Sequence, residues 1–228
     1  MAEFESVLTE VTLSTGGMGG ILTCPPRLQV QPGQYLLGYA PELNEPRTTA
    51  LFPVAIQPGA LRLAAPLPQT WAAGMPLLVR GPLGRGFTLP AQARRVALAA
   101  LNGSAERLTP LMTAALAQGA AVVLFSGSPP ASVSDEVEIL PLEQLPEAPA
   151  WADYLALDLM PAQAGNWRKL LAIRPTQPCP CSGEALIITD MPCGGLAECG
   201  VCAVETRLGW RLACKDGPVF PLSELEAR

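Results

Sequence analysis

Four of the seven cysteines lie close together near the end of the 228-residue chain. They are Cys193, Cys199, Cys202 and Cys214, in the segments MPCGGLAECGVC and WRLACKDG, with the spacing C-x5-C-x2-C-x11-C. Three clustered thiolates and a fourth from a following hairpin can surround a compact two-iron rhomb, in which each iron takes two thiolates. The spacing therefore predicts one [2Fe-2S] cluster on these four cysteines.

Three glycines within the cysteine segment favour the tight loop that such a cluster needs. Gly194, Gly195 and Gly200 accept a positive φ, and without a Cβ they let backbone N–H groups approach the sulfurs. Those N–H groups would partly neutralise an anionic cluster and raise its reduction potential.

Other uses of the cysteines remain open at this point. Four thiolates also bind a structural zinc ion, although zinc ribbons normally offer two C-x2-C arms and this chain offers one. Disulfides fit less well with an odd number of cysteines and no secretory signal. Cys179 and Cys181 are interpreted as loop residues or accessory thiols, and Cys24 as a small buried hydrophobic residue.

The composition excludes several classes of function. The absence of histidine removes the commonest general base, Ser-His and Cys-His nucleophile pairs, and all His-ligated metal sites. A net charge of −5 with only 15% charged residues gives no basic field for nucleic acid. No apolar run approaches the roughly 18 residues that span a bilayer, and residues 1–6 lack a signal-peptide pattern. We therefore expect a cytoplasmic protein, and the apolar composition suits a large permanent subunit interface.

The first part of the chain predicts a small antiparallel β-barrel or sandwich. Short strand patterns are separated by turn signals such as Pro32-Gly33 and Pro58-Gly59. The expected strands are 6–13, 34–39, 51–56, 61–65 and 76–79. We place the first domain at residues 1–88.

The middle of the chain predicts a parallel sheet. Two apolar runs flank a segment of helical spacing, which is the order of a βαβ unit. The expected strands are 95–101, 120–126, 137–140, 151–157 and 184–189, and the expected helices are 104–118 and 162–173. This α/β domain is assigned to 89–189, and the cysteine-rich module, closed by a hairpin of 204–206 and 210–213, to 190–228.

The cysteine segment and ACKDGPVF, residues 213–220, resemble the iron-sulfur, electron-transfer subunit of class 1B dihydroorotate dehydrogenase, within the ferredoxin reductase superfamily. The resemblance implies a flavin-binding barrel, a nicotinamide-binding α/β domain and a C-terminal [2Fe-2S] module. GPLGRGF looks like the family's glycine-rich segment between the first two domains, which makes Gly81, Gly84 and Gly86 candidate flavin contacts. Taken alone, this motif is equally well a turn-forming linker.

The chain also departs from the family pattern. The first two cysteines are separated by five residues where the family has four, and only Arg47 or Thr49 could stand in for the flavin motif. Ala105 and Arg107 replace glycines of the nicotinamide loop, and DLMP at 158–161 replaces a Cys-Gly-Pro motif. FAD therefore has weak sequence support, and NAD binding is expected to be lost or much weakened.

The residues and the resemblance together predict an electron-transfer subunit for a partner oxidoreductase. The resemblance implies a flavin-containing dihydroorotate dehydrogenase-like catalytic subunit as partner in a hetero-oligomer, with neither nucleic acid binding nor membrane insertion. One alternative is a non-redox interaction subunit stabilised by zinc. Another is an FAD-dependent NADH oxidoreductase in which other residues replace the missing motifs.

Overall fold

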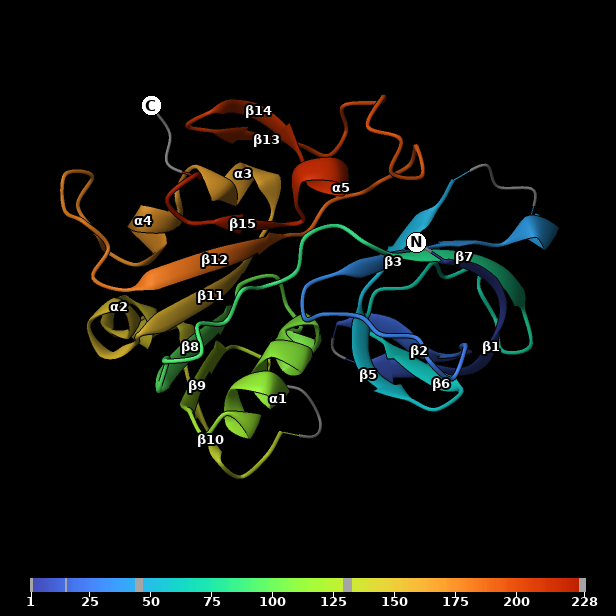
Figure 1. The fold of residues 1–228 in the computed structure, drawn as a ribbon, viewed down its shortest axis with the longest axis horizontal. Coiled ribbons are helices and arrows are strands. Elements are labelled where there is room, and N and C mark those ends of the chain that lie inside the picture. The colour runs from blue at the N-terminus through green and yellow to red at the C-terminus, as the bar shows by residue number, and fades with distance from the viewer. Residues whose placement is uncertain (1, 15, 44–46, 129–132, 226–228) are drawn as a thin grey trace.

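The computed structural model describes residues 2–14, 16–43, 47–128 and 133–225. Two sheets lie side by side, and a small hairpin near the C-terminus covers one end of the second sheet (Figure 1). The expected order of barrel, parallel sheet and cysteine-rich hairpin is present. The boundaries at residues 88 and 189 stay predictions.

The first sheet has seven strands, is antiparallel throughout, and curls into a barrel (Figure 1). Its strands are β1 (Ala2–Ser14), β2 (Gly17–Thr23), β3 (Tyr35–Tyr39), β4 (Thr49–Leu51), β5 (Pro53–Gln57), β6 (Ala60–Leu63) and β7 (Pro76–Leu83). The spatial order is β4-β3-β7-β1-β2-β6-β5. Leucines at alternate strand positions, including Leu8, Leu36 and Leu77, fill the interior.

Two features of the barrel differ from expectation. The strand expected at 51–56 is two strands, β4 and β5, which lie at opposite ends of the strand order. Strand β2 was missed because its sequence, GMGGILT, is rich in glycine, which weakens a strand signal. The single residue Phe52 separates β4 from β5, so one continuous apolar run supplies both edge strands of the sheet.

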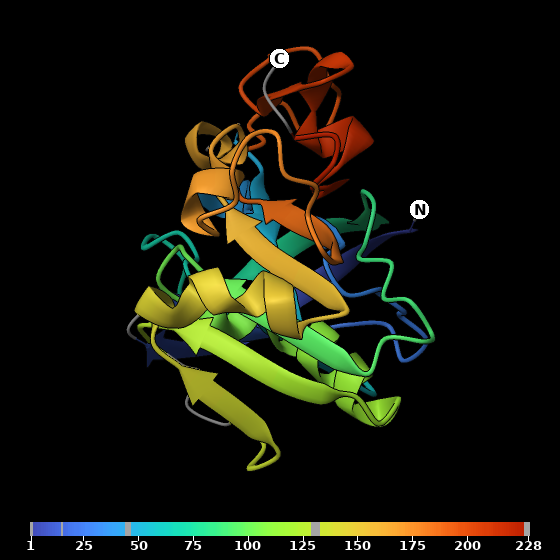
Figure 2. The same cartoon turned by 90° about the vertical axis from the view of Figure 1, so that its left-hand side faces the viewer.

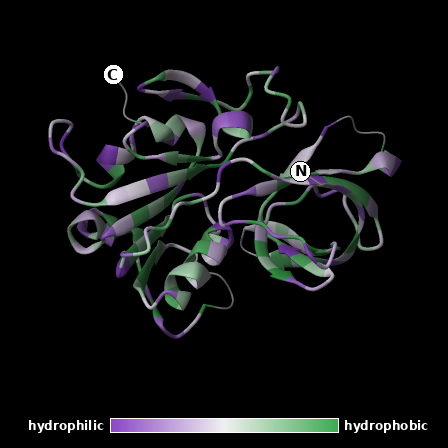
Figure 3. Cartoon of the chain, in the orientation of Figure 1, coloured by the Kyte–Doolittle hydropathy of each residue, from purple (hydrophilic) through white to green (hydrophobic). Residues whose placement is uncertain are grey.

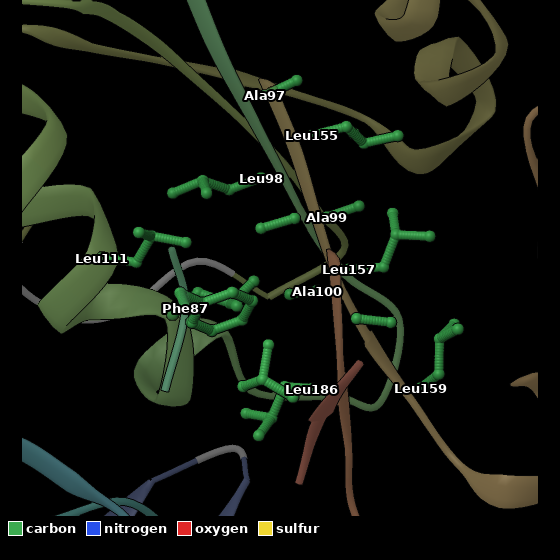
Figure 4. Packing of buried hydrophobic residues seen from close by; sticks show 14 of the residues in the cluster. Phe87, Ala97, Leu98, Ala99, Ala100, Leu111, Leu155, Leu157, Leu159 and Leu186 are labelled. Atoms are coloured by element: carbon green, nitrogen blue, oxygen red, sulfur yellow. The ribbon is translucent and has the colours of Figure 1, made fainter. Parts of the chain in front are cut away.

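The second sheet has six strands in the order β10-β9-β8-β11-β12-β15. They are β8 (Arg95–Ala100), β9 (Ala121–Ser126), β10 (Val137–Leu140), β11 (Tyr154–Leu159), β12 (Ser182–Ile187) and β15 (Val219–Pro221). The first five are parallel, and β15 is antiparallel to β12. Because both faces of the sheet are covered, β8 and β11 are apolar except at Arg95 and Asp158. Leu98, Leu157 and Leu186 pack with Phe87 in the core (Figure 4).

Short helices cover this sheet, as the turned view in Figure 2 shows. The α-helices are α1 (Thr109–Ala117), α2 (Ala148–Trp151), α3 (Pro161–Ala164), α4 (Trp167–Leu170) and α5 (Ala213–Asp216), and the 3-10 helices are η1 (Pro41–Leu43), η2 (Ala105–Leu108) and η3 (Leu142–Glu147). The helix expected at 162–173 is interrupted at Gly165 and Asn166, and the strand expected from 151 begins at Tyr154.

The cysteine-rich segment forms the expected hairpin of β13 (Ala203–Thr206) and β14 (Gly209–Leu212). Strand β15, which the sequence did not predict, then returns the chain to the sheet of the middle segment. Hydrophilic residues gather on α5 and along parts of the hairpin, whereas strands of the sheet are predominantly hydrophobic (Figure 3). No helix in the described ranges is both long and apolar enough to cross a membrane.

Candidate metal centre

Two structural elements bring the cysteines together. Cys193 and Cys199 lie in the loop between β12 and β13, Cys202 precedes β13, and Cys214 lies in α5. The hairpin register continues past the strands, because the Ala213 N–H donates to the Cys202 carbonyl at 2.9 Å. The hairpin therefore places the third and fourth cysteines next to each other.

The four thiols form two hydrogen-bonded pairs. The Cys199 thiol donates a hydrogen bond to the Cys193 sulfur, and the Cys214 thiol donates to the Cys202 sulfur. In the described part of the chain, no three Cys, Asp or Glu side chains gather closely enough to hold a single metal ion. A structural zinc ion needs four donors around one point, whereas a [2Fe-2S] cluster needs two thiolates at each of two irons. The paired arrangement fits the cluster.

Backbone N–H groups donate to one sulfur of the first pair, that of Cys193. Burial raises the pKa of the Cys193 thiol, but N–H groups of Glu198, Cys199 and Leu196 and the Cys199 thiol donate to its sulfur and together lower the pKa to about 6. These donors stabilise the thiolate, which is the form that binds a metal.

The second pair is in a less polar environment. Burial raises the pKa of the Cys214 thiol to about 12, with further contributions from its hydrogen bond to Cys202 and from the charge of Cys193, against an opposing N–H of Ala197. Cys202 and Cys214 are both buried. Without a bound metal, the Cys214 thiol stays protonated, and a bound cation reverses this state.

Exposure differs between the two pairs. Cys199 is exposed and Cys193 half-buried, while the second pair is enclosed. Leu196 and Val201, from the same loop, expose 62% and 53% of their area, and Trp210 of β14 exposes 71%. One edge of the site therefore meets the surface beside exposed apolar side chains of its own loop.

The loop glycines adopt the backbone conformation that the sequence predicted. Gly194, Gly195 and Gly200 have φ of 65°, 74° and 72°. A Cβ at Gly195 would lie 3.3 Å from the Leu37 side chain. All three glycines therefore form left-handed turns, and Gly195 also approaches the barrel closely.

Three barrel side chains that sequence reasoning missed hold this segment. Thr48 Oγ1 donates to the Met191 carbonyl at 2.9 Å, and Tyr35 Oη donates to the Cys214 carbonyl at 3.0 Å. Arg80 Nη2 donates to the Gly194 carbonyl. The partners are 114 to 179 residues apart in sequence, so no local pattern could have found them.

The GPLGRGF segment contacts residues 191–217, which carry the four cysteines and are called the metal segment below, from another side. The Arg85 N–H donates to the Gly217 carbonyl at 2.5 Å, and the Arg85 side chain forms a 3.2 Å ion pair with Glu184. A Cβ at Gly84 would lie 2.5 Å from Pro218 and 2.6 Å from the Gly217 carbonyl oxygen. This segment therefore braces the chain just after Cys214.

Gly81 and Gly86 are also packed against protein atoms. A Cβ at Gly81 would lie 2.4 Å from Leu36, and one at Gly86 would lie 2.7 Å from the Pro32 carbonyl oxygen. Neither these two glycines nor Gly84 is among the residues that line the cleft described next. Close packing explains all three glycines, and their contact with a flavin stays a prediction.

A cleft of about 1080 Å³ separates the barrel from the second sheet and reaches the metal segment. Arg47, Thr48 and Thr49 line its barrel side, and Met191 and Val201 line the side of the metal segment. A ligand in this cleft would thus lie against the loop that carries Cys193.

The loop after β8 crosses this cleft to the barrel. Arg107 is buried, and its Nη2 donates to the Ala65 carbonyl at 2.6 Å, while the Ala65 N–H donates to Glu106 at 3.2 Å. Arg107 Nη1 has no hydrogen-bond partner among the described residues. The cleft therefore contains a buried, unpaired donor, a feature that fits a ligand with acceptor atoms, such as a flavin nucleotide.

Asp158 at the end of β11 faces the same region. Its Oδ1 accepts hydrogen bonds from the N–H groups of Leu101 and Asn102, whereas Oδ2 has no partner in the described structure. Burial raises the pKa of Asp158 to about 6, although these N–H groups and the charge of Arg107 oppose the shift. Burial likewise lowers the pKa of Arg107.

The remaining cysteines lie away from the four. Cys24 is buried with the barrel interior. Cys179 and Cys181 precede β12, whose other end leads to the Cys193 loop, and their sulfurs are 3.9 Å apart. The hydrogen bond to Cys179 raises the pKa of the Cys181 thiol, and burial raises it further.

Comparisons with known proteins agree with this architecture. Residues 189–226 match the family model for the iron-sulfur cluster binding domain of dihydroorotate dehydrogenase B. A comparison with curated proteins found no match.

Several solved structures share the fold at low identity. The structure described as NADH-dependent reduced ferredoxin-NADP oxidoreductase aligns over 98% of this chain and 90% of that chain, with 16% identity and a TM-score of 0.72. Phthalate dioxygenase reductase aligns over 83% and 70%, with 14% identity and a TM-score of 0.57. A ferredoxin NADP+ reductase from Neisseria gonorrhoeae aligns over 82% and 99%, with 11% identity and a TM-score of 0.58.

The predicted fold class and the predicted iron-sulfur cofactor are confirmed by these matches. The chain has a ferredoxin reductase-like fold, and its C-terminal segment, residues 189–226, matches the iron-sulfur cluster binding domain of dihydroorotate dehydrogenase B.

Proposed function

We propose that this chain is an electron-transfer subunit that holds one [2Fe-2S] cluster through Cys193, Cys199, Cys202 and Cys214. The observation that carries the proposal is the meeting of these thiols in two pairs within the segment that matches an iron-sulfur cluster binding domain. When bound, the cluster accepts and releases single electrons.

The protein positions the ligands and sets the surroundings of the cluster. N–H groups of the 194–199 loop donate to the Cys193 sulfur, and such donors raise the reduction potential of an anionic cluster. Buried Cys202 and Cys214 keep water from one side, while exposed Cys199 gives electrons a short route to a partner. This arrangement suits the transfer of electrons between partners. The chain has no histidine for acid-base chemistry.

The partner that we propose is a flavin-containing dihydroorotate dehydrogenase catalytic subunit, bound in a cytoplasmic hetero-oligomer. The name of the matched domain supports this choice. Leu196 and Val201 in the loop of Cys199, and Trp210 in the neighbouring hairpin, are exposed and support docking of a partner on this module, because exposed aromatic and aliphatic side chains anchor protein interfaces.

Metal analysis and spectroscopy test the cluster. Anaerobically purified protein is expected to contain iron and acid-labile sulfide in equal amounts, and to give an electron paramagnetic resonance signal after reduction. Cys24→Ser should keep both, because Cys24 lies in the barrel core. Zinc in place of iron and sulfide would refute the proposal and support the scaffold alternative.

Co-purification with a dihydroorotate dehydrogenase catalytic subunit tests the partner. Trp210→Ala should weaken the complex by about tenfold or more, as loss of an interface anchor costs at least about 1.4 kcal/mol. Absence of a complex with the unaltered chain would refute the partner while leaving the cluster assignment intact.

A flavin in the cleft is a second proposal. It is supported by the cleft volume of about 1080 Å³, by the unpaired Arg107 Nη1, and by the contact of the cleft with the Met191 segment. Arg107, which stands where the family places a glycine for nicotinamide, instead donates to the Ala65 carbonyl of the barrel, and this contact supports an acceptor other than NAD. This proposal expects the purified protein to retain flavin and the flavin absorbance to persist when NADH is added. Bleaching by NADH would favour an intact NADH oxidoreductase.

A further inference from the structure

The barrel supplies a positive charge to the metal segment. Arg80 of β7 donates from its guanidinium to the Gly194 carbonyl, one residue after Cys193. The same guanidinium lies close to Gly195, since a Cβ built there would be 3.6 Å from Arg80 Nη2. The charge is therefore held against the loop between the first two ligands.

Tyr35 of β3 completes this contact. Its hydroxyl donates to the Cys214 carbonyl at 3.0 Å, and a Cβ on Gly195 would lie 3.6 Å from that hydroxyl. The hydroxyl is buried, and the carbonyl that it binds belongs to a ligand residue. Tyr35 and Arg80 thus reach both ligand-bearing segments from neighbouring strands of the barrel.

The charge of Arg80 is not neutralised by an ion pair in the described part of the chain, where no carboxylate lies within 4.0 Å of its guanidinium. Its cross-strand neighbour on β1, Glu3, is exposed and forms no such pair. A guanidinium cannot lose its proton in proteins, so this charge is permanent.

A fixed cation next to an anionic cluster favours the reduced state. A [2Fe-2S] cluster on four thiolates is negatively charged, and reduction adds one more negative charge. A nearby positive charge therefore stabilises the reduced form more than the oxidised form, and low-dielectric surroundings strengthen the effect. Backbone N–H donors act in the same direction, but Arg80 contributes a full charge.

We infer that Arg80 raises the reduction potential of the cluster. Tyr35 positions the segment that carries the fourth ligand, Cys214, through its hydrogen bond to the Cys214 carbonyl. This inference rests on the proposed [2Fe-2S] cluster. Arg80 is a positioning and tuning residue, because it touches the loop carbonyl and not the cluster ligands themselves.

A potentiometric titration followed by electron paramagnetic resonance tests the inference. Arg80→Gln, in the cluster-loaded full-length chain, is expected to lower the ratio of reduced to oxidised cluster about tenfold at a given ambient potential, which is about 59 mV for one electron. The matched control is Arg62→Gln on β6, at the side of the barrel away from the hairpin (Figure 1). It removes the same charge and should leave the ratio unchanged within about twofold.

A second substitution separates charge from loop structure. Arg80→Lys keeps the positive charge and loses the planar fork, so its ratio should stay within about threefold of the unaltered chain. This variant decides the question if Arg80→Gln fails to keep iron.

Three outcomes would overturn the inference. They are an unchanged potential in Arg80→Gln with full iron content, an equal change in Arg62→Gln, and a tenfold loss in Arg80→Lys. An unaltered chain that contains no [2Fe-2S] cluster would instead refute the proposed function, so the two failures are distinguishable.

Discussion

Replacing Gly84 by alanine tests whether the glycine-rich segment braces the metal segment. Gly84 has a φ of +73°, and its missing Cβ would collide with the Gly217 carbonyl oxygen at 2.6 Å and with Pro218 at 2.5 Å. Neither neighbour is the end of a flexible side chain, so the contact can be relieved only by moving the backbone that follows Cys214.

The matched control is Gly59→Ala in the turn between β5 and β6. Gly59 has a similar φ of +82°, and nothing lies within 4 Å of its Cβ position. A left-handed alanine costs about 1–2 kcal/mol, and overpacking costs about 1–3 kcal/mol more. We therefore expect the free energy of unfolding to fall by about 1–2 kcal/mol in Gly59→Ala and by about 2–5 kcal/mol in Gly84→Ala.

Urea unfolding of both variants, with iron counted per chain, measures the difference. Iron content should fall in Gly84→Ala, because α5 and Cys214 directly precede Gly217, and should be kept in Gly59→Ala. Free energies of unfolding equal within about 0.5 kcal/mol would refute the bracing role. Equal stability with loss of bound flavin in Gly84→Ala alone would support the flavin contact that the family resemblance implies.

Three further predictions concern other parts of the site. Cys214→Ser should abolish the electron paramagnetic resonance signal and lower iron content at least tenfold, because one iron loses a ligand; an undiminished signal would exclude Cys214 as a ligand. The double variant Cys179→Ser and Cys181→Ser should retain full iron content, since this pair precedes β12 whereas the metal loop follows it, and lost iron would contradict that separation. Burial raises the folded-state pKa of Asp158 to about 6, so the folded chain binds this proton more tightly than the unfolded chain does; the free energy of unfolding should therefore fall by about 2 kcal/mol as pH rises from about 4 to 6. Urea titrations across that range should show a flatter profile in Asp158→Asn, and a profile of unchanged slope would show that Asp158 does not cause it.

The cysteine cluster and the order of elements could be predicted from sequence because both are encoded locally. The spacing of Cys193, Cys199 and Cys202, together with their flanking glycines, identifies a tight thiolate loop without reference to the rest of the chain. Continuous apolar runs around a helical segment likewise predicted the parallel sheet, because strands buried on both faces must be apolar throughout.

Tertiary structure decided what surrounds those cysteines. In the sequence, Tyr35 appeared only as an ordinary strand residue and Arg80 only as the residue after an expected strand. The three glycines of GPLGRGF pointed to a flavin as readily as to the packing now seen. Strand β15, only three residues long, acquires its identity from pairing with β12. Contacts of this kind depend on which strands become neighbours after folding. Side chains as far apart in sequence as Tyr35 and Cys214 share no periodicity, so only the folded chain shows that the barrel holds the metal segment.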